Sequence, residues 1–348
     1  MLHTSLQTYL CSDEVSPLFL EGDARNILCG IPDNSVDCCI TSPPYWRQRE
    51  YSAGGIGDEA DYREYIQNLL AVFQQVKRVL KPTGSFWLNL GDTYVDKTQI
   101  GIPWRVALAL SDMQGWILRN SVIWHKVKGG PDNSCDKLRN VHEMVFHFVK
   151  QAKGYYYDVD AIKTDARKTR VVNGAIVSAT GVSGIRYRRQ IELSTALCDA
   201  EKQSALSALE TILNDVRRGE LNDFRMIIRG QQRITHSDSI KLSGRAKELK
   251  QKGFYFLKYD PKGTKPSDVW EILPEDTQQR TGHYASYPEA LCIIPILATC
   301  PQDGLTLDPF CGTGTTNIVA KQLSRKSLGI DISSEYLSIA AERAMTLL

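Results

Sequence analysis

The chain has 348 residues, of which 42% are hydrophobic and 24% charged, with a formal net charge of +2. This length and composition are sufficient for a sizeable buried core and for one large domain or two. They argue against a membrane-spanning segment and a signal peptide, since no apolar run is long enough to cross a bilayer and residues 1–20 include Asp13 and Glu14.

The first 160 residues alternate between segments typical of strands and of helices. Residues 61–80 have the clearest pattern, an apolar stripe from Tyr65 to Leu80 that ends at Lys81-Pro82. In chain order we expect strands at 18–23, 36–40, 85–90, 116–124 and 141–149, and helices at 24–30, 61–80 and 103–113. This alternation predicts an α/β protein with a parallel or mostly parallel sheet.

The strand predicted at 36–40 leads into a stiff corner, Thr41-Ser42-Pro43-Pro44-Tyr45-Trp46, in which two prolines restrict the backbone. Open α/β sheets bind their ligands at the carboxyl ends of strands. A hydroxyl, free carbonyl groups and two rings at such a place suit a flat, hydrogen-bonding ligand. An ordinary turn with two half-buried aromatic residues explains the same sequence, so this motif alone leaves both interpretations open.

Metal binding is not expected. His142-Glu143 and His147 miss the zinc-protease spacing by one residue, and in a strand the two rings would point to opposite faces. We interpret these histidines as structural, or as part of the wall of a site. The nine cysteines are scattered and suggest neither a zinc site nor a disulfide framework, which favours a reducing cytoplasm.

The middle of the chain differs from its flanks in charge. Residues 161–265 contain 21 Lys and Arg against 11 Asp and Glu, whereas the remainder has an acidic excess. A basic insert in an acidic frame is typical of a segment that binds a polyanion, although a solvated basic surface would have the same composition.

Within this insert we expect a mobile loop at 166–190 and a helix at 192–218, with leucines such as Leu193 on its packed side. Basic and amide side chains here suit phosphates and base edges. The candidates for contact with nucleic acid are Arg186, Arg188, Arg229, Gln232, Arg233, Lys241 and Arg245, together with Trp46 of the corner.

From residue 268 the alternation resumes, with helices expected at 287–298, 315–323 and 335–347 and strands at 304–307 and 327–330. The loop 308–316 contains Gly312 and Gly314, which permit a tight turn and close approach to a ligand. Asp331 lies 19 residues beyond Gly312, where an acid can bind ribose hydroxyls. A P-loop is excluded and the three-glycine dinucleotide fingerprint is incomplete, so we expect an adenosine-like ligand without a pyrophosphate.

Together these motifs resemble the S-adenosylmethionine-dependent, amino-methylating DNA methyltransferases of bacterial restriction–modification systems. Residues 41–46 are similar to the family's S/D/N-P-P-Y/F motif, and 308–314 to its F-x-G-x-G cofactor loop. The corner precedes the loop, as in the β group. The resemblance implies a Rossmann-like, seven-stranded, mostly parallel sheet of circularly permuted order with an inserted mixed or helical target-recognition domain. The strand at 304–310 would then lie beside the strand before Ser42.

The resemblance also implies a domain division and a cofactor site. Residues 1–165 and 266–348 would form the catalytic and cofactor-binding halves, and 166–265 the recognition insert. Phe310, Gly312 and Gly314 would shape the methionine and ribose pocket. Asp331 would bind the ribose hydroxyls and Asp23 would face the adenine amino group, although either acid could instead cap a helix or turn. The other cofactor candidates are Thr41, His283, Ser286, Asp308, Cys311, Thr313 and Thr315.

For catalysis the resemblance implies that Ser42 and the Pro43 carbonyl accept hydrogen bonds from the exocyclic amine of a flipped base, on which Tyr45 stacks. Pro44 completes the catalytic motif. Such hydrogen bonds favour a more tetrahedral nitrogen, so that the amine attacks the sulfonium methyl directly. Serine at position 42 favours cytosine N4, with adenine N6 as the alternative.

The implied partner is double-stranded DNA. A restriction endonuclease that shares the site without direct contact is a further expectation, as are a bacterial or archaeal cytoplasm and a monomeric state. A DNA-binding module with a vestigial cofactor fold is the alternative from another class of protein.

Overall fold

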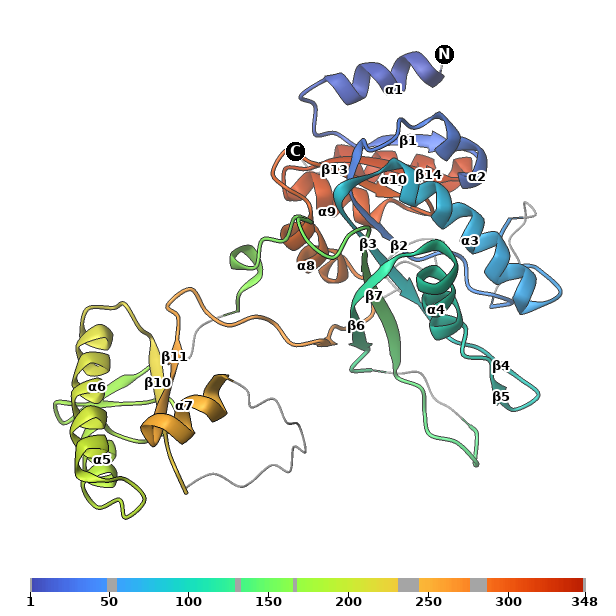
Figure 1. Cartoon of the computed structure of the whole chain (residues 1–348). Coiled ribbons are helices and arrows are strands. Elements are labelled where there is room, and N and C mark those ends of the chain that lie inside the picture. Colours follow the sequence, from blue (N-terminus) through green and yellow to red (C-terminus); the bar gives the residue numbers. More distant parts are fainter. Residues whose placement is uncertain are drawn as a thin grey trace. The chain divides into compact units, whose positions relative to one another are not determined.

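Figure 1 shows the computed structural model of the chain, which describes residues 2–48, 55–128, 133–164, 168–230, 244–275 and 287–346. The chain forms two compact units. Met1–Ile162 and Ser267–Leu348 make the first unit, and Lys163–Pro266 makes the second. Among the described residues, no helix is both long enough and apolar enough to cross a membrane.

The first unit is built on one sheet, for which the described residues provide eight strands. In order across the sheet these are β1 (Leu18–Glu21), β14 (Lys326–Asp331), β13 (Leu305–Asp308), β2 (Val36–Thr41), β3 (Leu80–Leu90), β7 (His142–Val149), β6 (Ile117–His125) and β12 (Val269–Glu271). Neighbours are parallel except at β7, which is antiparallel to β3 and β6. The predicted α/β class with a mostly parallel sheet is confirmed, and β12 is a strand beyond the seven expected.

Strands from the two ends of the chain pair in this sheet. Thr306 of β13 lies opposite Cys38 of β2, and Leu307 lies opposite Cys39. Every residue of both strands is buried, as expected for central parallel strands covered on both faces. Because the two strands are parallel, their carboxyl ends reach the same edge of the sheet. The expected adjacency of residues 304–310 to the strand before Ser42 is confirmed.

Helices cover both faces of the sheet. Successive residues of a strand point to opposite faces, so Cys39 contributes to one apolar core and Cys38 to the other. The Cys39 side is covered by α1 (Leu2–Cys11), α2 (Ala24–Ile27), η1 (Leu28–Gly30), α3 (Tyr62–Val79) and α4 (Ile102–Gln114). The Cys38 side is covered by α8 (Ala290–Thr299) and α9 (Thr315–Gln322). The remaining elements are the β4–β5 hairpin (Tyr94–Val95 and Thr98–Gln99), η2 (Asp160–Ile162) and α10 (Ser334–Met345).

The helix expected at 61–80 is present as α3, which Asp61 caps by accepting a hydrogen bond from the Arg63 amide. Helix α1 was not expected from the sequence. Its Tyr9 hydroxyl donates to the Ser327 carbonyl at 3.1 Å and accepts from the Ser327 amide at 2.9 Å. These bonds join residues more than 300 positions apart, so local sequence patterns could not indicate them.

His147 of β7 is an uncharged histidine inside the sheet. Its ring stacks on Trp87 with centroids 4.1 Å apart, and Nε2 lies 3.0 Å from Ser85 Oγ. Burial, with the nearby charge of Arg119, lowers the pKa of His147 to about 3. The fold therefore opposes protonation of this ring, whereas the unfolded chain accepts a proton near pH 6.5.

Between pH 7 and about pH 4.5 the His147 side chain takes up a proton in the unfolded chain but not in the folded one. We expect this difference by itself to lower the free energy of unfolding by about 2–3 kcal/mol. The direction follows from the depressed pKa: this stability is complete above pH 6.5 and is lost as the pH falls towards about 3. Urea denaturation of the wild type and of His147→Gln at the two pH values measures the difference. Equal pH dependence in the two proteins would contradict the prediction.

The second unit contains two helices packed on an antiparallel strand pair. Its elements are β8 (Arg170–Val172), β9 (Ala175–Val177), α5 (Gly184–Glu192), α6 (Asp199–Arg217), β10 (Asp223–Ile228), α7 (Gly244–Lys252) and β11 (Phe254–Tyr259). Strand β10 pairs with β11, and β8 with β9. Tyr187 and Ile191 of α5 meet Leu209 of α6 and Phe224 of β10 in a separate apolar core.

One expectation for this unit is wrong, and a second is correct only from Asp199 onward. Of the mobile loop expected at 166–190, the described residues from 168 onward contain β8, β9 and most of α5. The helix expected at 192–218 begins only at Asp199, where Glu201 accepts a hydrogen bond from the Cys198 amide, and Leu193 is 70% exposed. Strands β8 and β9 and helix α5 are short, and burial of a few residues such as Tyr187 determines them, which sequence periodicity does not report.

Candidate active site

The corner that follows β2 is fixed by packing. Pro43 is buried, and the Tyr65 hydroxyl donates to the Pro44 carbonyl at 2.8 Å. Trp46 is 4% exposed, and its Nε1 donates to the Glu59 carbonyl at 2.8 Å. Trp46 is therefore a core residue. Its ring is enclosed and is not available for the DNA contact predicted from the sequence.

Ser42 and Tyr45 belong to a chain of hydrogen bonds that ends at Glu143 of β7. Ser42 Oγ donates to Tyr45 Oη at 3.1 Å, and Tyr45 Oη donates to Glu143 Oε2 at 2.6 Å. The other carboxylate oxygen, Glu143 Oε1, lies 2.5 Å from Lys126 Nζ. Asn89 Nδ2 lies within 3.3 Å of the serine, tyrosine and carboxylate oxygens. The corner is thus connected to a paired carboxylate on a strand that lies far along the chain.

The Tyr45 ring is held against the backbone that follows β3. A Cβ added to Gly91 would lie 2.7 Å from Tyr45 Cε2, so this close approach requires glycine. Burial and the neighbouring Glu143 carboxylate raise the pKa of Tyr45 well above its usual value. Tyr45 therefore remains protonated and is available as a hydrogen-bond donor.

Sequence reasoning missed three members of this network: Asn89, Lys126 and Glu143. Glu143 was considered only as part of a zinc-protease motif whose spacing does not fit. A signal was present, because Asn89 lies in the buried end of β3 and Glu143 precedes a fully buried run of β7. Buried polar side chains are nearly always hydrogen-bonded, so each one indicates a partner nearby.

Asp308, at the end of β13, connects the corner to the glycine loop. Its Oδ1 accepts from Thr41 Oγ1 at 2.6 Å and from the Phe310 amide at 3.1 Å. Its Oδ2 accepts from Thr316 Oγ1 at 2.7 Å and from the Tyr287 hydroxyl at 3.0 Å. The side chain is 1% exposed, and this burial raises the pKa of Asp308. The Thr41–Asp308 bond holds the two predicted motifs together.

The glycine loop turns tightly into α9. Gly312 and Gly314 have φ values of 50° and 78°, a region that favours glycine. A Cβ on Gly314 would lie 2.9 Å from Ala340 Cβ and 3.2 Å from Phe19 Cζ. The loop residues Cys311, Thr313 and Thr315 are buried, with the Thr313 carbonyl accepting from Arg343 Nη1 at 2.7 Å.

Asp331 and Asp23 lie at the ends of neighbouring strands beside this loop. Asp331 Oδ2 accepts from the Gly312 amide at 2.8 Å, and burial raises the pKa of Asp331. The Asp331 carbonyl accepts from the Gly22 amide at 2.9 Å. Asp23 caps α2 and pairs with Arg25, whose hydrogen bonds lower the pKa of Asp23. Both carboxylates therefore have the capping roles foreseen as alternatives. Each Asp331 oxygen accepts from one backbone amide, whereas both Asp23 oxygens accept from Arg25.

Some predicted residues lie outside the described part of the chain. These are the cofactor candidates His283 and Ser286 and the DNA-binding candidates Gln232, Arg233 and Lys241. Within the described residues, no group of three or more His, Cys, Asp or Glu is arranged to hold a metal ion.

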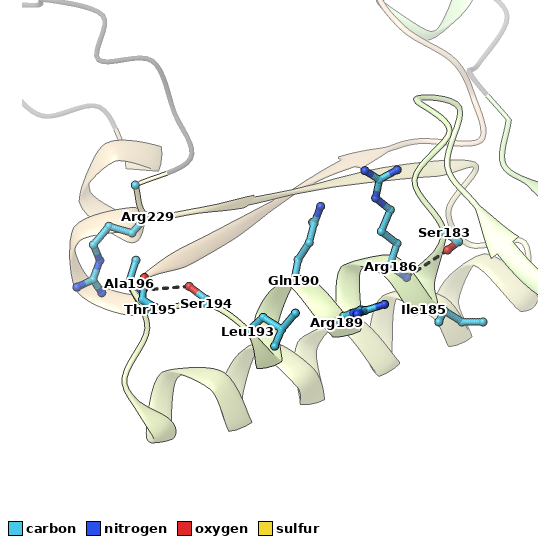
Figure 2. A pocket seen from close by; sticks show the side chains of 11 residues that line it. Ser183, Ile185, Arg186, Arg189, Gln190, Leu193, Ser194, Thr195, Ala196 and Arg229 are labelled. Carbon is cyan, nitrogen blue, oxygen red and sulfur yellow. Dashed lines mark hydrogen bonds between the residues drawn. The ribbon is translucent and has the colours of Figure 1, made fainter.

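The second unit carries an open cavity of about 850 Å³ along one side of α5 (Figure 2). Arg186, Arg189 and Gln190 of α5 line it, and Arg229 lies at one end. Arg229 pairs with Glu201 and is half-buried. Of the other predicted basic residues, Arg188 pairs with Glu210 of α6, and Arg245 is exposed on α7. Sequence reasoning did not select Arg189 or Gln190.

Solved methyltransferases share this fold. The PvuII DNA methyltransferase (cytosine-N4-specific) matches with a TM-score of 0.57 at 17% identity, over 94% of this chain and 86% of that chain. A putative DNA modification methylase from Thermus thermophilus, solved in complex with S-adenosyl-L-methionine, matches with a TM-score of 0.50 at 20% identity, over 95% of each chain. The fold therefore places this chain in the α/β class of protein that these methyltransferases share.

Sequence comparison specifies the family within that class. A DNA methylase family matches residues 36–342. The Type II methyltransferase M.SmaI of Serratia marcescens is 28% identical over 357 residues, which cover 93% of this chain and 89% of that protein. The chain belongs to this DNA methylase family.

The residues at the sheet edge fit S-adenosylmethionine. The adenosine part of this molecule presents hydroxyl and amino donors, which carboxylates such as Asp331 and Asp23 can accept. The loop between them is kept close to its neighbours by Gly314, where any side chain would collide with Ala340. An acidic edge also suits the positive sulfonium.

Proposed function

We propose that this protein methylates the N4 amine of a flipped cytosine at a specific site in duplex DNA. The observation that carries the proposal is the 2.6 Å hydrogen bond between Thr41 and Asp308, which holds the Ser42 corner beside the glycine loop. Direct transfer needs the methyl donor and the amine in contact and in line. Serine at position 42, where the family's adenine enzymes mostly carry aspartate, favours cytosine.

The glycine loop and its neighbouring acids form the proposed cofactor site. When bound, S-adenosylmethionine supplies an electrophilic methyl carbon and leaves as a neutral thioether. Phe310, Gly312 and Gly314 shape the methionine and ribose pocket. Asp331 binds the ribose hydroxyls, and Asp23 faces the adenine amino group.

The corner binds and activates the amine. An exocyclic amine is a poor nucleophile, because its lone pair is delocalised into the ring. Ser42 Oγ and the Pro43 carbonyl accept its two protons, which favours a more tetrahedral nitrogen with a freer lone pair. Tyr45 stacks on the flipped base.

The base is tested by digesting DNA methylated by the purified protein to nucleosides and identifying the product by mass. N4-methylcytosine is expected. N6-methyladenine as the sole product would overturn the choice of cytosine in favour of the second base that the family methylates. Sequencing of the same methylated DNA identifies the site.

The biological setting is proposed from the same relationship. Type II methyltransferases such as M.SmaI are the relatives of this chain. We therefore infer that the enzyme protects host DNA in the cytoplasm of a bacterium or archaeon, as a monomer. The endonuclease that we propose alongside it would recognise the same site without touching this protein.

The second unit is the proposed DNA-recognition domain, with α5 as its reading helix. Arg186 and Arg189 are long cations on the cavity side of the helix, and Gln190, next to Arg189, can bind a base edge. Arg188 and Arg229 are engaged with Glu210 and Glu201, so we expect them to contribute less than the cavity-facing arginines.

We expect Arg186→Ala with Arg189→Ala to weaken duplex binding by roughly tenfold or more and to lower the salt dependence by about one counterion per arginine. Arg217→Ala, on the exposed side of α6, changes the net charge equally per residue and should have little effect. Fluorescence anisotropy over a salt series measures both quantities. An equal effect per arginine for all three residues would favour a merely solvated basic surface.

A further inference from the structure

The hydrogen bonds from Ser42 to Glu143 run in one direction. A carboxylate can only accept, so the 2.6 Å contact requires Tyr45 to donate to Glu143. The Tyr45 oxygen is then an acceptor, and it takes the Ser42 hydroxyl proton at 3.1 Å. The single hydroxyl proton of Ser42 is therefore used in the hydrogen bond to Tyr45 and is not available to the substrate. What Ser42 Oγ retains is acceptor capacity, which an amine N–H requires.

The orientation of Asn89 supports this direction. Its Nδ2 lies 2.8 Å from Glu143 Oε2 and 2.9 Å from Tyr45 Oη. The flipped amide would place Asn89 Oδ1 against the carboxylate and is therefore disfavoured. Lys126 places a positive charge beside the Glu143 carboxylate, and the Glu143 side chain is only 11% exposed. Each contact favours an ionised acceptor at the end of the chain.

We propose that Glu143 is a positioning residue that keeps Ser42 Oγ an acceptor towards the amine and finally receives the proton that the methylated amine releases. The inference rests on the proposed function, because it requires an amine at Ser42. It holds for cytosine and adenine alike, since both bases present an exocyclic amine.

The proton transfer balances along the existing hydrogen bonds. After methylation the nitrogen carries a positive charge and one proton too many. That proton passes to Ser42 Oγ, the serine proton passes to Tyr45 Oη, and the tyrosine proton passes to Glu143 Oε2. One N–H and two O–H bonds break and three O–H bonds form. Ser42 and Tyr45 remain neutral, and the cation and the carboxylate neutralise each other.

The chemistry favours this direction of transfer. A methylated aminium on an aromatic ring is a strong acid, because losing its proton returns the lone pair to the ring. The raised pKa of Tyr45 means that this residue is not itself a resting base. Glu143 is then the base at the end of the chain, and it loses its proton to solvent before the next turnover.

The test is single-turnover methyl transfer from labelled S-adenosylmethionine to a duplex containing the site that the wild type methylates. Glu143→Gln is expected to slow the transfer by about 10²-fold. Dissociation constants for S-adenosylmethionine and DNA, measured separately, should change by less than about threefold, as expected for a change confined to the chemical step. A Glu143→Gln rate within about threefold of the wild type would overturn the proposal.

A double-mutant cycle tests whether Tyr45 and Glu143 act in one chain of hydrogen bonds. Tyr45→Phe interrupts the same path, so Tyr45→Phe with Glu143→Gln should be no slower than the slower single variant. If the two rate losses multiply, Tyr45 and Glu143 act independently, and the proposal is overturned. Glu342→Gln, the same substitution on the exposed side of α10, is the matched control and should transfer at the wild-type rate.

A further variant tests whether the slower transfer comes from the lost proton path or from Lys126, which Glu143→Gln leaves without its carboxylate. Glu143→Gln with Lys126→Met removes both charges, and its thermal unfolding shows whether the fold is kept. We expect it to be as slow as Glu143→Gln, and a fast double variant would overturn the proposal. The wild-type product nucleoside reports independently on the proposed function, since methyladenine would change the base without affecting these rate ratios.

Discussion

Replacing Ser42 with alanine should slow single-turnover methyl transfer by about 10³-fold, the loss typical of removing one preorganised polar contact to the reacting group. Alanine leaves the amine with only the Pro43 carbonyl as an acceptor, so the nitrogen lone pair stays delocalised in the ring. Affinity for S-adenosylmethionine should be unchanged, because the proposed cofactor contacts lie in the glycine loop and at Asp331.

Ser35→Ala is a matched control for this experiment. Ser35 precedes the opposite end of β2 and donates to the Pro32 carbonyl at 2.8 Å. Its loss should leave the rate at the wild-type level. If Ser42→Ala instead changed only the dissociation constants, the hydroxyl would contribute to binding and not to activation of the amine.

Replacing Asp308 with alanine should lower the unfolding free energy by about 3–5 kcal/mol and abolish cofactor binding. Four donors converge on this carboxylate at 2.6–3.1 Å, and alanine leaves the Thr41, Thr316 and Tyr287 hydroxyls without it. The hydrogen-bonded connection between Thr41 of β2 and the glycine loop is lost as well. Urea denaturation and calorimetric titration with S-adenosylmethionine measure the two effects.

Two milder substitutions show which property of Asp308 matters. Burial raises the pKa of Asp308, so its charge is disfavoured by the fold and its acceptor capacity is what stabilises. Asp308→Asn should therefore cost less than Asp308→Ala. Tyr287→Phe removes one donor and should cost about 1 kcal/mol. If Asp308→Ala lowered the free energy of unfolding by less than about 1 kcal/mol, the four hydrogen bonds to Asp308 would not stabilise the fold.

Local patterns were sufficient for the frame of the first unit. Helix α3 was predictable because a long apolar stripe with an Asp61 cap and a Lys81-Pro82 stop specifies both ends of a helix. The adjacency of β13 and β2 was implied by the resemblance of the corner and the glycine loop, in this order, to the methyltransferase family. In the second unit the periodicity was weak, and the prediction of a mobile loop failed where tertiary burial of Tyr187 and Ile191 forms α5.

The sequence by itself determined the class of protein, the positions of the two motifs and the order in which they occur, because these depend on residue types at short, fixed spacings. Only the tertiary structure decided that Trp46 is enclosed, that Asp308 joins the motifs, and that Glu143 ends the chain of hydrogen bonds from Ser42. The physical reason is that Glu143 and Asp308 act through partners roughly 100 and 270 positions away. Such contacts exist only once parallel and antiparallel strands bring distant residues to one edge of the sheet.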